Sequence, residues 1–371
     1  MTTTNPSSPE KGQRSAEVLV APTWKCNLDC SYCFVRETNV TAEAGVMSPD
    51  TAVRVMDALA EGLGDTKKIC IHLYGGEPFT NLAAIQAMVK RAKEIKPPRF
   101  TFAVTTNGTV LSDAVIDVLD AGKFQVVLSI DGPPAVHDEC RRGVNGTPTH
   151  NDVMRFLDAV RSRTSCYVWG AAVVRSGWRL IQASDYLRTL PVNAVKAQAV
   201  RLAAGTPYAL TPEEHELYKE DLQAVGRRVI EELEAGKFPL DNRFGSRVLQ
   251  LLVGGERVRF CDAGNTNFGI TPSGNVLACL LLGNGARLGH IDDDPHTWRE
   301  AGRKWKARPL RSKCHSCKYL AMCGGGCPAA LSVCGEEECD IVAANCDVAT
   351  AIFEHFKDKK EDLLTLAGIT D

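Results

Sequence analysis

Three cysteines near the start of the chain could bind a metal cluster. Cys26, Cys30 and Cys33 are spaced C-x3-C-x2-C, so one short loop can bring three thiolates together. An iron–sulfur cluster of the four-iron type takes a thiolate at each iron, and three cysteines would leave the fourth iron open to a small molecule. A zinc site is the alternative, but zinc fingers usually pair C-x2-C halves to supply four ligands. The spacing therefore favours a four-iron cluster with one open iron.

This loop resembles the cluster-binding loop of radical S-adenosylmethionine (radical SAM) enzymes, in which an aromatic residue precedes the last cysteine. Tyr32 takes that place here. The resemblance implies that Cys26, Cys30 and Cys33 bind the cluster and that Tyr32 packs near the adenine. It also implies that the open iron chelates the methionine moiety of S-adenosylmethionine, which an electron then cleaves to a 5′-deoxyadenosyl radical. Tyr32 as a plain packing aromatic is the alternative, and the two roles are compatible.

The composition is that of an ordinary globular protein. The chain has 371 residues, 44% of them apolar and 24% charged, with a formal net charge of −2. This length suits two domains, or one large domain with an appendage, and the charge argues against electrostatic capture of nucleic acid or an acidic membrane. No signal peptide is recognisable, and no apolar run approaches the ~20 residues of a membrane helix. The fifteen cysteines are therefore expected in a reducing cytoplasm, where metal binding is their more common use.

Strands and helices are predicted to alternate through the first half of the chain. The predicted strands are 17–22, 69–74, 100–105, 124–130, 166–174 and 194–202. The predicted helices are 47–63, 81–96, 112–121, 151–164 and 180–190. This alternation predicts an α/β fold with a parallel sheet and right-handed crossovers, whose site is built from loops at the carboxyl ends of the strands. The family resemblance implies a partial (β/α)6 barrel.

Changes in composition predict the domain organisation. A disordered tail is expected at 1–15 and the barrel at 16–210. A charged helical stretch without strands is expected to form a bridge at 211–258. The segment 259–347 is dense in Cys and Gly and is predicted to be a second, smaller domain, followed by an amphipathic closing helix at 348–371.

The turn after the second predicted strand reads Gly75-Gly76-Glu77-Pro78. Its glycines let the backbone approach a ligand closely, and its proline stiffens the turn. On its own such a turn commonly just ends a strand. In the radical SAM pattern, these four residues bind the methionine ammonium group through backbone carbonyls and the Glu77 carboxylate.

Asn107, Ser129 and Arg141 are expected to line the same pocket. Asn107 follows the third predicted strand, and Ser129 ends the fourth. The run from Asp131 to Arg141 resembles the stretch after the fourth strand of the family. By that analogy Ser129 touches the methionine carboxylate or the ribose, and Arg141 pairs with the carboxylate, a geometry that suits a guanidinium. The alternatives are a turn residue for Ser129 and a surface ion pair for Arg141.

A second ordered set of cysteines lies near the C-terminus. It follows the pattern C-x12-G-x4-C, then C-x2-C-x5-C-x3-C, then a last C, and comprises Cys261, Cys279, Cys314, Cys317, Cys323, Cys327 and Cys346. A four-thiolate zinc knuckle at 314–327 is one interpretation. The pattern also resembles the SPASM extension of radical SAM enzymes, which holds two auxiliary four-iron clusters.

That resemblance assigns the cysteines to a nearer and an outer auxiliary cluster. It implies that the nearer cluster is bound by Cys261, Cys279 and Cys327. It implies that the outer cluster is bound by Cys314, Cys317, Cys323 and Cys346. The fourth iron of the nearer cluster is then either open to substrate or bound by Cys334 or Cys339.

Two departures from the family pattern bear on the reaction. Sulfatase-maturing members carry a catalytic aspartate directly after the cysteine of the Gly-x4-Cys step, whereas Cys279 is followed here by Leu280. Several thioether-forming members carry an N-terminal leader-binding domain, for which the sixteen residues before the first predicted strand are too few. A leader would then bind to the barrel surface or to a separate protein. Asp262 is a candidate base by position alone, with an ordinary solvated aspartate as the alternative.

The sequence thus predicts a radical SAM/SPASM oxidoreductase that matures a peptide. It would take hydrogen from a side-chain carbon of a ribosomally synthesised precursor and crosslink or otherwise oxidise it, with a carbon–carbon crosslink preferred. The expected cofactors are three [4Fe-4S] clusters and S-adenosyl-L-methionine. The expected partners are the precursor peptide, a flavodoxin- or ferredoxin-type reductant and a separate leader-binding protein, but neither nucleic acid nor a membrane. The alternatives are a sulfatase-maturase-like or small-molecule dehydrogenase and a zinc-stabilised binding module without catalysis.

Overall fold

The computed structural model describes residues 15–37, 45–95, 100–254 and 259–366. The predicted tail at 1–15 lies almost entirely outside this part of the chain. The chain forms two compact units, each of which is discontinuous in sequence. We call the described residues of 14–171 and 262–309 the sheet unit, and those of 172–261 and 310–366 the helical unit. The predicted domain boundaries remain a prediction, since each unit combines segments that are far apart in the sequence.

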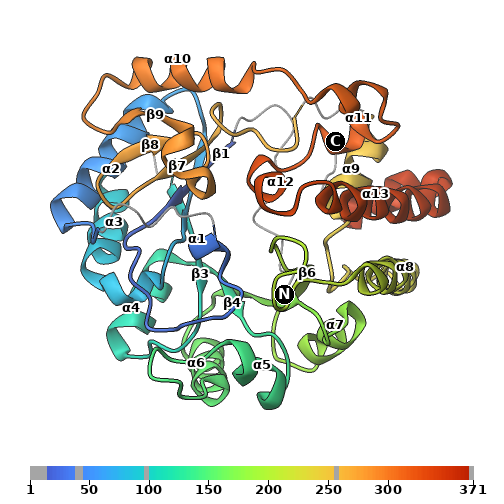
Figure 1. The fold of residues 1–371 in the computed structure, drawn as a ribbon. Coiled ribbons are helices and arrows are strands. Elements are labelled where there is room, and N and C mark those ends of the chain that lie inside the picture. Colours follow the sequence, from blue (N-terminus) through green and yellow to red (C-terminus); the bar gives the residue numbers. More distant parts are fainter. Residues whose placement is uncertain (1–14, 38–44, 96–99, 255–258, 367–371) are drawn as a thin grey trace. The chain divides into compact units, whose positions relative to one another are not determined.

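A parallel sheet forms the centre of the sheet unit (Figure 1). Its strands are β1 (Ser15–Val20), β2 (Lys68–Leu73), β3 (Phe100–Thr106), β4 (Gln125–Ser129) and β5 (Tyr167–Val174). Each pairs in parallel with the next, in chain order. The predicted α/β fold with a parallel sheet is confirmed. The carboxyl ends of these strands therefore lie along one edge, where the loops that follow them can meet.

Three further strands extend the sheet on the other side of β1. β7 (Asn267–Ile270) pairs in parallel with β1, and β8 (Asn275–Leu277) and β9 (Arg287–His290) follow in antiparallel order. The sequence did not predict these strands individually, because three or four residues are too few to show an alternating pattern. Their pairing places the segment that begins at Asp262 in the same unit as the cysteine loop.

Helices cover the parallel sheet because each presents an apolar face to it. These are α2 (Pro49–Gly62), α3 (Leu82–Glu94), α4 (Asp113–Gly122) and α6 (His150–Arg163), which lie along the outside of the strands (Figure 1). Ser48 and Ser112 begin α2 and α4 as N-caps by accepting bonds from Thr51 N and Val115 N. The unit also contains α1 (Phe34–Glu37), the 3₁₀ helices η2 (Pro78–Asn81) and η3 (Leu280–Ala286), α5 (Pro134–Cys140) and α10 (Pro295–Lys306).

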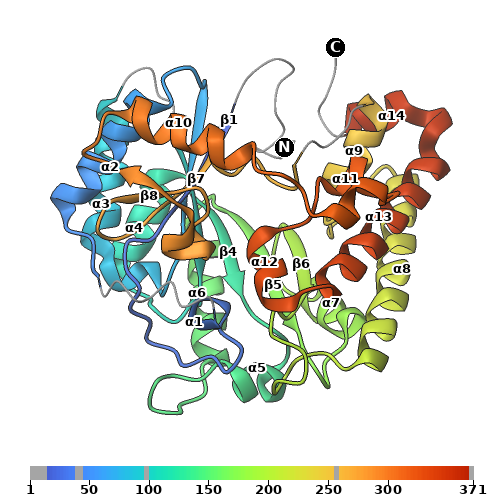
Figure 2. The ribbon, with the colours of Figure 1, turned by 45° about the horizontal axis from the view of Figure 1, so that its top comes forward.

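The helical unit contains strand β6 (Ala194–Ala199), which adjoins the last residues of β5, and those residues of β5 belong to the same unit. Its long helices α8 (Pro212–Glu234) and α13 (Glu337–Phe356) lie side by side (Figure 2). They approach closely at Gly226, where a Cβ would lie 2.3 Å from Val348 Cγ1. The other helices are α7 (Leu180–Arg188), α9 (Gly245–Val253), η4 (Ser312–Ser316), α11 (Leu320–Cys323), α12 (Pro328–Cys334), η5 (Lys357–Lys359) and α14 (Lys360–Leu366).

The predicted closing helix therefore begins earlier than expected and is interrupted after Phe356. Among the helices that the structure describes, none combines the length and the apolar character that crossing a membrane requires.

Candidate functional site

The cysteine loop begins directly after β1 and is tied down by the segment that follows α5. Asp29 N donates to Arg142 O at 2.8 Å, and Ser31 N donates to Cys140 O at 3.1 Å. Leu28 forms an isolated antiparallel bridge with Gly143. Backbone bonds thus hold the three thiols at the carboxyl end of the sheet, as predicted from the strand order.

The Gly75–Pro78 turn packs against the first residues of the cysteine loop. Gly76 N donates to Thr23 O at 3.1 Å, and Glu77 N donates to Lys25 O at 2.9 Å. Gly75 has a φ of +134°, and a Cβ at Gly76 would lie only 2.2 Å from Lys25 O. Glycine is therefore required because two backbones touch here. The sequence predicted that the glycines let the backbone approach a ligand. In this structure they let it approach the loop that carries the cysteines.

Glu77 is fully buried and engaged with its own unit. Its Oε1 accepts from Thr106 Oγ1 at 2.9 Å and from Phe79 N at 3.2 Å, while its Oε2 accepts from Asn107 N at 2.7 Å. Burial raises the pKa of this carboxyl to about 7, and the three hydrogen bonds oppose that rise. A carboxylate has about four lone-pair sites, so capacity to bind a ligand ammonium group remains. The predicted contact with the cofactor stays a prediction.

Asn107 links β3 to the cysteine loop. Its Nδ2 donates to Asn27 Oδ1 at 3.0 Å and approaches Cys26 Sγ at 3.8 Å. Asn27 in turn donates to Thr109 Oγ1 at 2.7 Å. The sequence predicted Asn107 as a cofactor contact. It did not predict Asn27 and Thr109, for which a polar side chain was the one sign of a role in the site. In the structure, Asn107 is a positioning residue for Cys26.

A buried aspartate joins Tyr32 to Arg141. Asp131 is 0% exposed, and its Oδ2 accepts bonds from the Tyr32 hydroxyl and from Arg141 Nε, the latter at 3.1 Å. The Arg141 guanidinium also lies over the Tyr32 ring, 5.4 Å from its centroid. Burial raises the pKa of Tyr32 well above its usual value, so its hydroxyl stays protonated. Asp131, for which the sequence predicted no role, thus fixes both Tyr32 and Arg141, the two predicted cofactor contacts.

The bond to Asp131 uses only one of the five guanidinium N–H groups of Arg141. The others can still meet a ligand carboxylate, so the predicted role of Arg141 is compatible with its ion pair. Ser129 is the last residue of β4 and is half-buried. Its placement at the carboxyl end of the strand agrees with the predicted pocket, but its hydroxyl contact with a cofactor is still a prediction.

The three thiols of the loop lie close enough to influence one another. Burial raises the pKa of Cys30 to about 11, the Arg141 charge opposes this, and charges on Cys33 and Cys26 would raise it further. Burial likewise raises the pKa of Cys26. The thiols thus form a compact group of sulfur donors under a buried guanidinium, and metal binding there would release their protons. This donor set fits a cluster that takes one thiolate per iron.

Within the described ranges, no three His, Cys, Asp or Glu side chains converge as the ligands of a single metal ion. A four-iron cluster needs its thiolates farther apart, since each binds a different iron.

His137 contacts the backbone of Asp131 and is expected to make the stability of the protein fall at acidic pH. Its Nδ1 accepts from Asp131 N at 3.4 Å, and its Nε2 meets Thr149 Oγ1 at 3.2 Å. Burial and the Arg141 charge lower its pKa to about 4, against weaker effects of Asp131 and Asp138, while His150 also lowers it. Because only the unfolded state takes up this proton between about pH 6.5 and 4, stability is lost as the pH falls through that window.

The measurement is the difference in unfolding free energy between pH 7 and pH 5 under anaerobic conditions. The wild type is expected to lose about 2 kcal/mol more than His137→Asn, whose side-chain oxygen can still accept from Asp131 N. Equal losses in the two proteins would show that His137 is not the acid-sensitive group.

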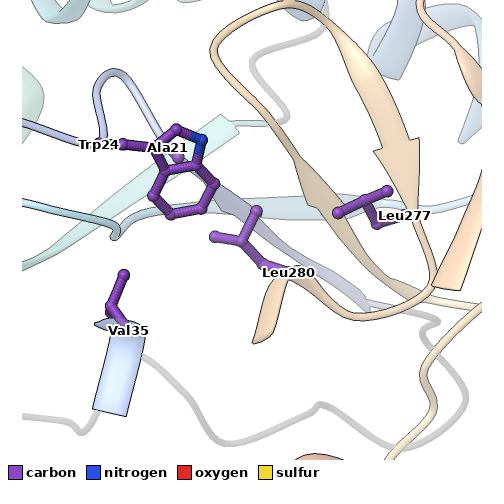
Figure 3. Packing of buried hydrophobic residues seen from close by; sticks show 5 residues of the cluster. All are labelled: Ala21, Trp24, Val35, Leu277 and Leu280. Atoms are coloured by element: carbon purple, nitrogen blue, oxygen red, sulfur yellow. The ribbon is translucent and has the colours of Figure 1, made fainter. Parts of the chain in front are cut away.

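Leu280, in the position of the sulfatase-maturing aspartate, belongs to the apolar core behind the cysteine loop. It is 1% exposed and packs in a cluster with Ala21, Trp24, Val35 and Leu277 (Figure 3). Cys33 also packs against this cluster. Leu280 therefore supports the loop, and its neighbour Cys279 lies in the same unit.

Asp262 holds the turn before β7. Its carboxylate accepts bonds from Asn265 at 2.7 Å, from Thr266 and from Lys306. Burial would raise its pKa, but these bonds outweigh burial and lower it. A carboxylate with a lowered pKa is a weak base, so its contacts favour a structural role over the candidate base.

Five of the remaining predicted ligands lie in or beside consecutive helices of the helical unit. Cys314 lies in η4, Cys317 follows it, Cys323 ends α11, Cys327 is the N-cap of α12, and Cys346 lies in α13. Cys261 belongs to the same unit, whereas Cys279 belongs to the sheet unit. Cys314 and Cys346 are buried, and Cys317 is exposed.

Comparison with known proteins finds a family match in the first half of the chain. Residues 20–179 match the model of the Radical SAM superfamily. The radical SAM cyclopropyl synthase TigE of Paramaledivibacter caminithermalis is 22% identical over 346 residues, which cover 87% of this chain and 70% of that protein. A cysteine-type anaerobic sulfatase-maturating enzyme of Clostridium perfringens is 23% identical over 329 residues, which cover 81% of this chain and 85% of that one.

Solved structures share the fold. Native anSMEcpe with bound AdoMet superposes with a TM-score of 0.74 at 19% identity, covering 95% of this chain and 100% of that one. Streptococcus suis SuiB bound to S-adenosylmethionine gives a TM-score of 0.60 at 17% identity, covering 86% of this chain and 72% of that one.

Proposed function

Since the chain is a radical SAM enzyme, we propose that it cleaves S-adenosylmethionine and uses the radical to oxidise a side chain of a ribosomally synthesised precursor peptide. The observation that carries the proposal is the cysteine loop held against the buried Tyr32–Asp131–Arg141 group. When bound there, a [4Fe-4S] cluster would supply the electron and the open coordination site for the cofactor.

The residues of the sheet unit would bind and orient the cofactor. Arg141 has N–H groups left to meet its carboxylate, and Glu77 has lone pairs left to meet its ammonium group. Tyr32, fixed by Asp131, would pack near the adenine. Gly75, Gly76, Pro78, Asn107 and Ser129 complete the proposed set of contacts.

A peptide substrate is supported by what the similar proteins act on. SuiB has been solved bound to the precursor peptide SuiA, and anSMEcpe with a Cp18Cys peptide. Crosslinking, with a carbon–carbon bond preferred, remains the proposed outcome. The sulfatase-maturase alternative is less favoured because buried Leu280 stands where those enzymes carry the base.

We further propose three [4Fe-4S] clusters, with the auxiliary ligand sets given above and Cys334 or Cys339 as candidates for the missing ligand. A flavodoxin- or ferredoxin-type protein would supply electrons in the cytoplasm, and the leader of the precursor would bind either to the barrel surface or to a separate protein. Membership of this enzyme family sets aside the zinc-stabilised binding module as an account of the whole chain.

The test of the radical chemistry is 5′-deoxyadenosine release by anaerobically reconstituted protein with dithionite. Cys30→Ala is expected to reduce release to that of a protein-free control, because one iron loses its thiolate. Cys166→Ala is the matched control, since this buried thiol lies in the same unit but donates to Leu119 O at 3.6 Å instead. Undiminished release by Cys30→Ala would overturn the proposal.

The test of the substrate is mass spectrometry of a precursor peptide encoded beside the gene and expressed with the enzyme. A crosslink removes two hydrogens, and the loss is expected to disappear with Cys30→Ala. An unmodified peptide alongside normal deoxyadenosine release would overturn the assignment to that peptide and leave the radical chemistry standing.

A further inference from the structure

A glycine turn and two arginines lie near the outer cysteines of the helical unit. Gly324, Gly325 and Gly326 have φ values of +67°, +93° and +79°. Burial raises the pKa of Cys323, and the backbone N–H groups of Gly325 and Gly326 in this left-handed run oppose that rise. Successive N–H groups in such a turn form a concave site that favours negative charge.

Two arginines add positive charge to the same cysteines. Arg311 Nη2 donates to Cys339 Sγ at 2.9 Å. Burial lowers the pKa of Arg311, but the bond to Cys339 and charges on Cys339 and Cys314 outweigh burial and raise it. Burial raises the pKa of Cys346, and the charge of Arg247, on α9, opposes that rise. The Nε atoms of both arginines are buried without a hydrogen-bond partner in the part of the chain that the structure describes. Unpaired buried donors are costly, so these two are poised for an acceptor that the polypeptide itself does not provide.

Cys339 belongs to this group by its position on α13. It lies seven residues before Cys346, which is about two helical turns, so both thiols project from the same face. A negative charge on Cys339 would raise the pKa of Cys323, and a negative charge on Cys323 would raise the pKa of Cys346, so these thiols lie near one another. Cys334, in contrast, interacts electrostatically with Arg201 and Cys327. The structure therefore separates the two cysteines that the sequence left as alternatives.

Resting on the three-cluster content of the proposed function, we propose that Arg247 and Arg311 raise the reduction potential of the outer cluster by donating to its sulfurs. Cys339 anchors the Arg311 guanidinium and is not itself an iron ligand. Reduction adds negative charge to a cluster, so nearby positive donors stabilise the reduced form more than the oxidised form. Residues that hydrogen-bond to metal ligands tune a site in this way.

The experiment is an EPR-monitored redox titration of the reconstituted full chain, with the outer signal identified by its loss in Cys346→Ala. Arg311→Gln and Arg247→Gln are each expected to lower the ratio of reduced to oxidised cluster about tenfold at a fixed potential, a shift of about 59 mV for one electron. Arg311→Lys, which keeps the charge, should recover part of the shift. Arg228→Gln is the matched control, because this α8 arginine pairs with Asp185 at the surface, and no shift is expected.

The outcomes separate the inference from the proposal on which it rests. About twelve irons per chain in the wild type, with the shifts above, supports both. Twelve irons with unshifted potentials in both Gln variants overturns the role of the arginines alone. About eight irons or fewer, with no signal lost in Cys346→Ala, overturns the three-cluster content and the inference with it. Cys339→Ser is expected to keep all its iron, and a loss of about four irons would make Cys339 a ligand instead.

Discussion

Asp131→Ala is expected to destabilise the protein by about 3–5 kcal/mol, because it leaves a buried guanidinium without its partner. The side chains of Asp131 and Arg141 are 1% and 11% exposed. Removal of the carboxylate also leaves the Tyr32 hydroxyl without its acceptor. The measurement is urea unfolding of the two proteins side by side under anaerobic conditions, together with 5′-deoxyadenosine release, which should fall with stability because Tyr32 and Arg141 lose their common anchor.

The double variant Asp131→Ala/Arg141→Met distinguishes a buried charge from a mere cavity. Replacing both members of a buried ion pair by apolar groups is often nearly neutral, so the double variant should regain much of the stability while release stays low. Asp120→Ala is the surface control, since Asp120 and Lys123 are 46% and 69% exposed, and it should cost less than about 1 kcal/mol. A single variant as stable as this control would contradict the assigned role of Asp131.

The sheet could be predicted from the sequence because its signals are local. Strands such as 69–74 are apolar and β-branched, and the helices between them have apolar faces at helical spacing. The rule that parallel strands bring their carboxyl ends to one edge then placed the cysteine loop, the Gly75–Pro78 turn and Asn107 together. The fold class followed from chain order and needed no knowledge of individual contacts.

The partners within the site could not be predicted, because they depend on contacts between distant residues. Asp131 and Tyr32 are ninety-nine positions apart, and Asn107 and Cys26 are eighty-one apart. A single sequence gives no sign that Asp131 rather than solvent would pair with Arg141, or that Gly76 would press on Lys25. Likewise β7 is recognisable only once β1 presents an edge for it to pair with.

Gly76→Ala is expected to disrupt the cysteine loop although it adds a single methyl group. The new Cβ would lie 2.2 Å from Lys25 O and 2.7 Å from Trp24 O, and these are backbone atoms that cannot rotate away. Relieving the overlap must move the residues just before Cys26. A displacement of about 1 Å at a reacting centre can cost roughly 100-fold in rate, so deoxyadenosine release should fall by about that factor, and overpacking should cost about 1–3 kcal/mol of stability.

Gly285→Ala separates this effect from the general effect of replacing a glycine. Gly285 lies in the same unit, in η3, and a Cβ there would meet nothing within 4 Å. Its substitution should leave iron content, stability and deoxyadenosine release close to those of the wild type. If Gly76→Ala matched Gly285→Ala in all three measurements, the turn would not be pressing on the cysteine loop. If Gly76→Ala kept its iron but no longer released deoxyadenosine, the overlap would act on cofactor binding rather than on cluster assembly. The turn would then contact both the cofactor, as the sequence predicts, and the cysteine loop, as the structure shows.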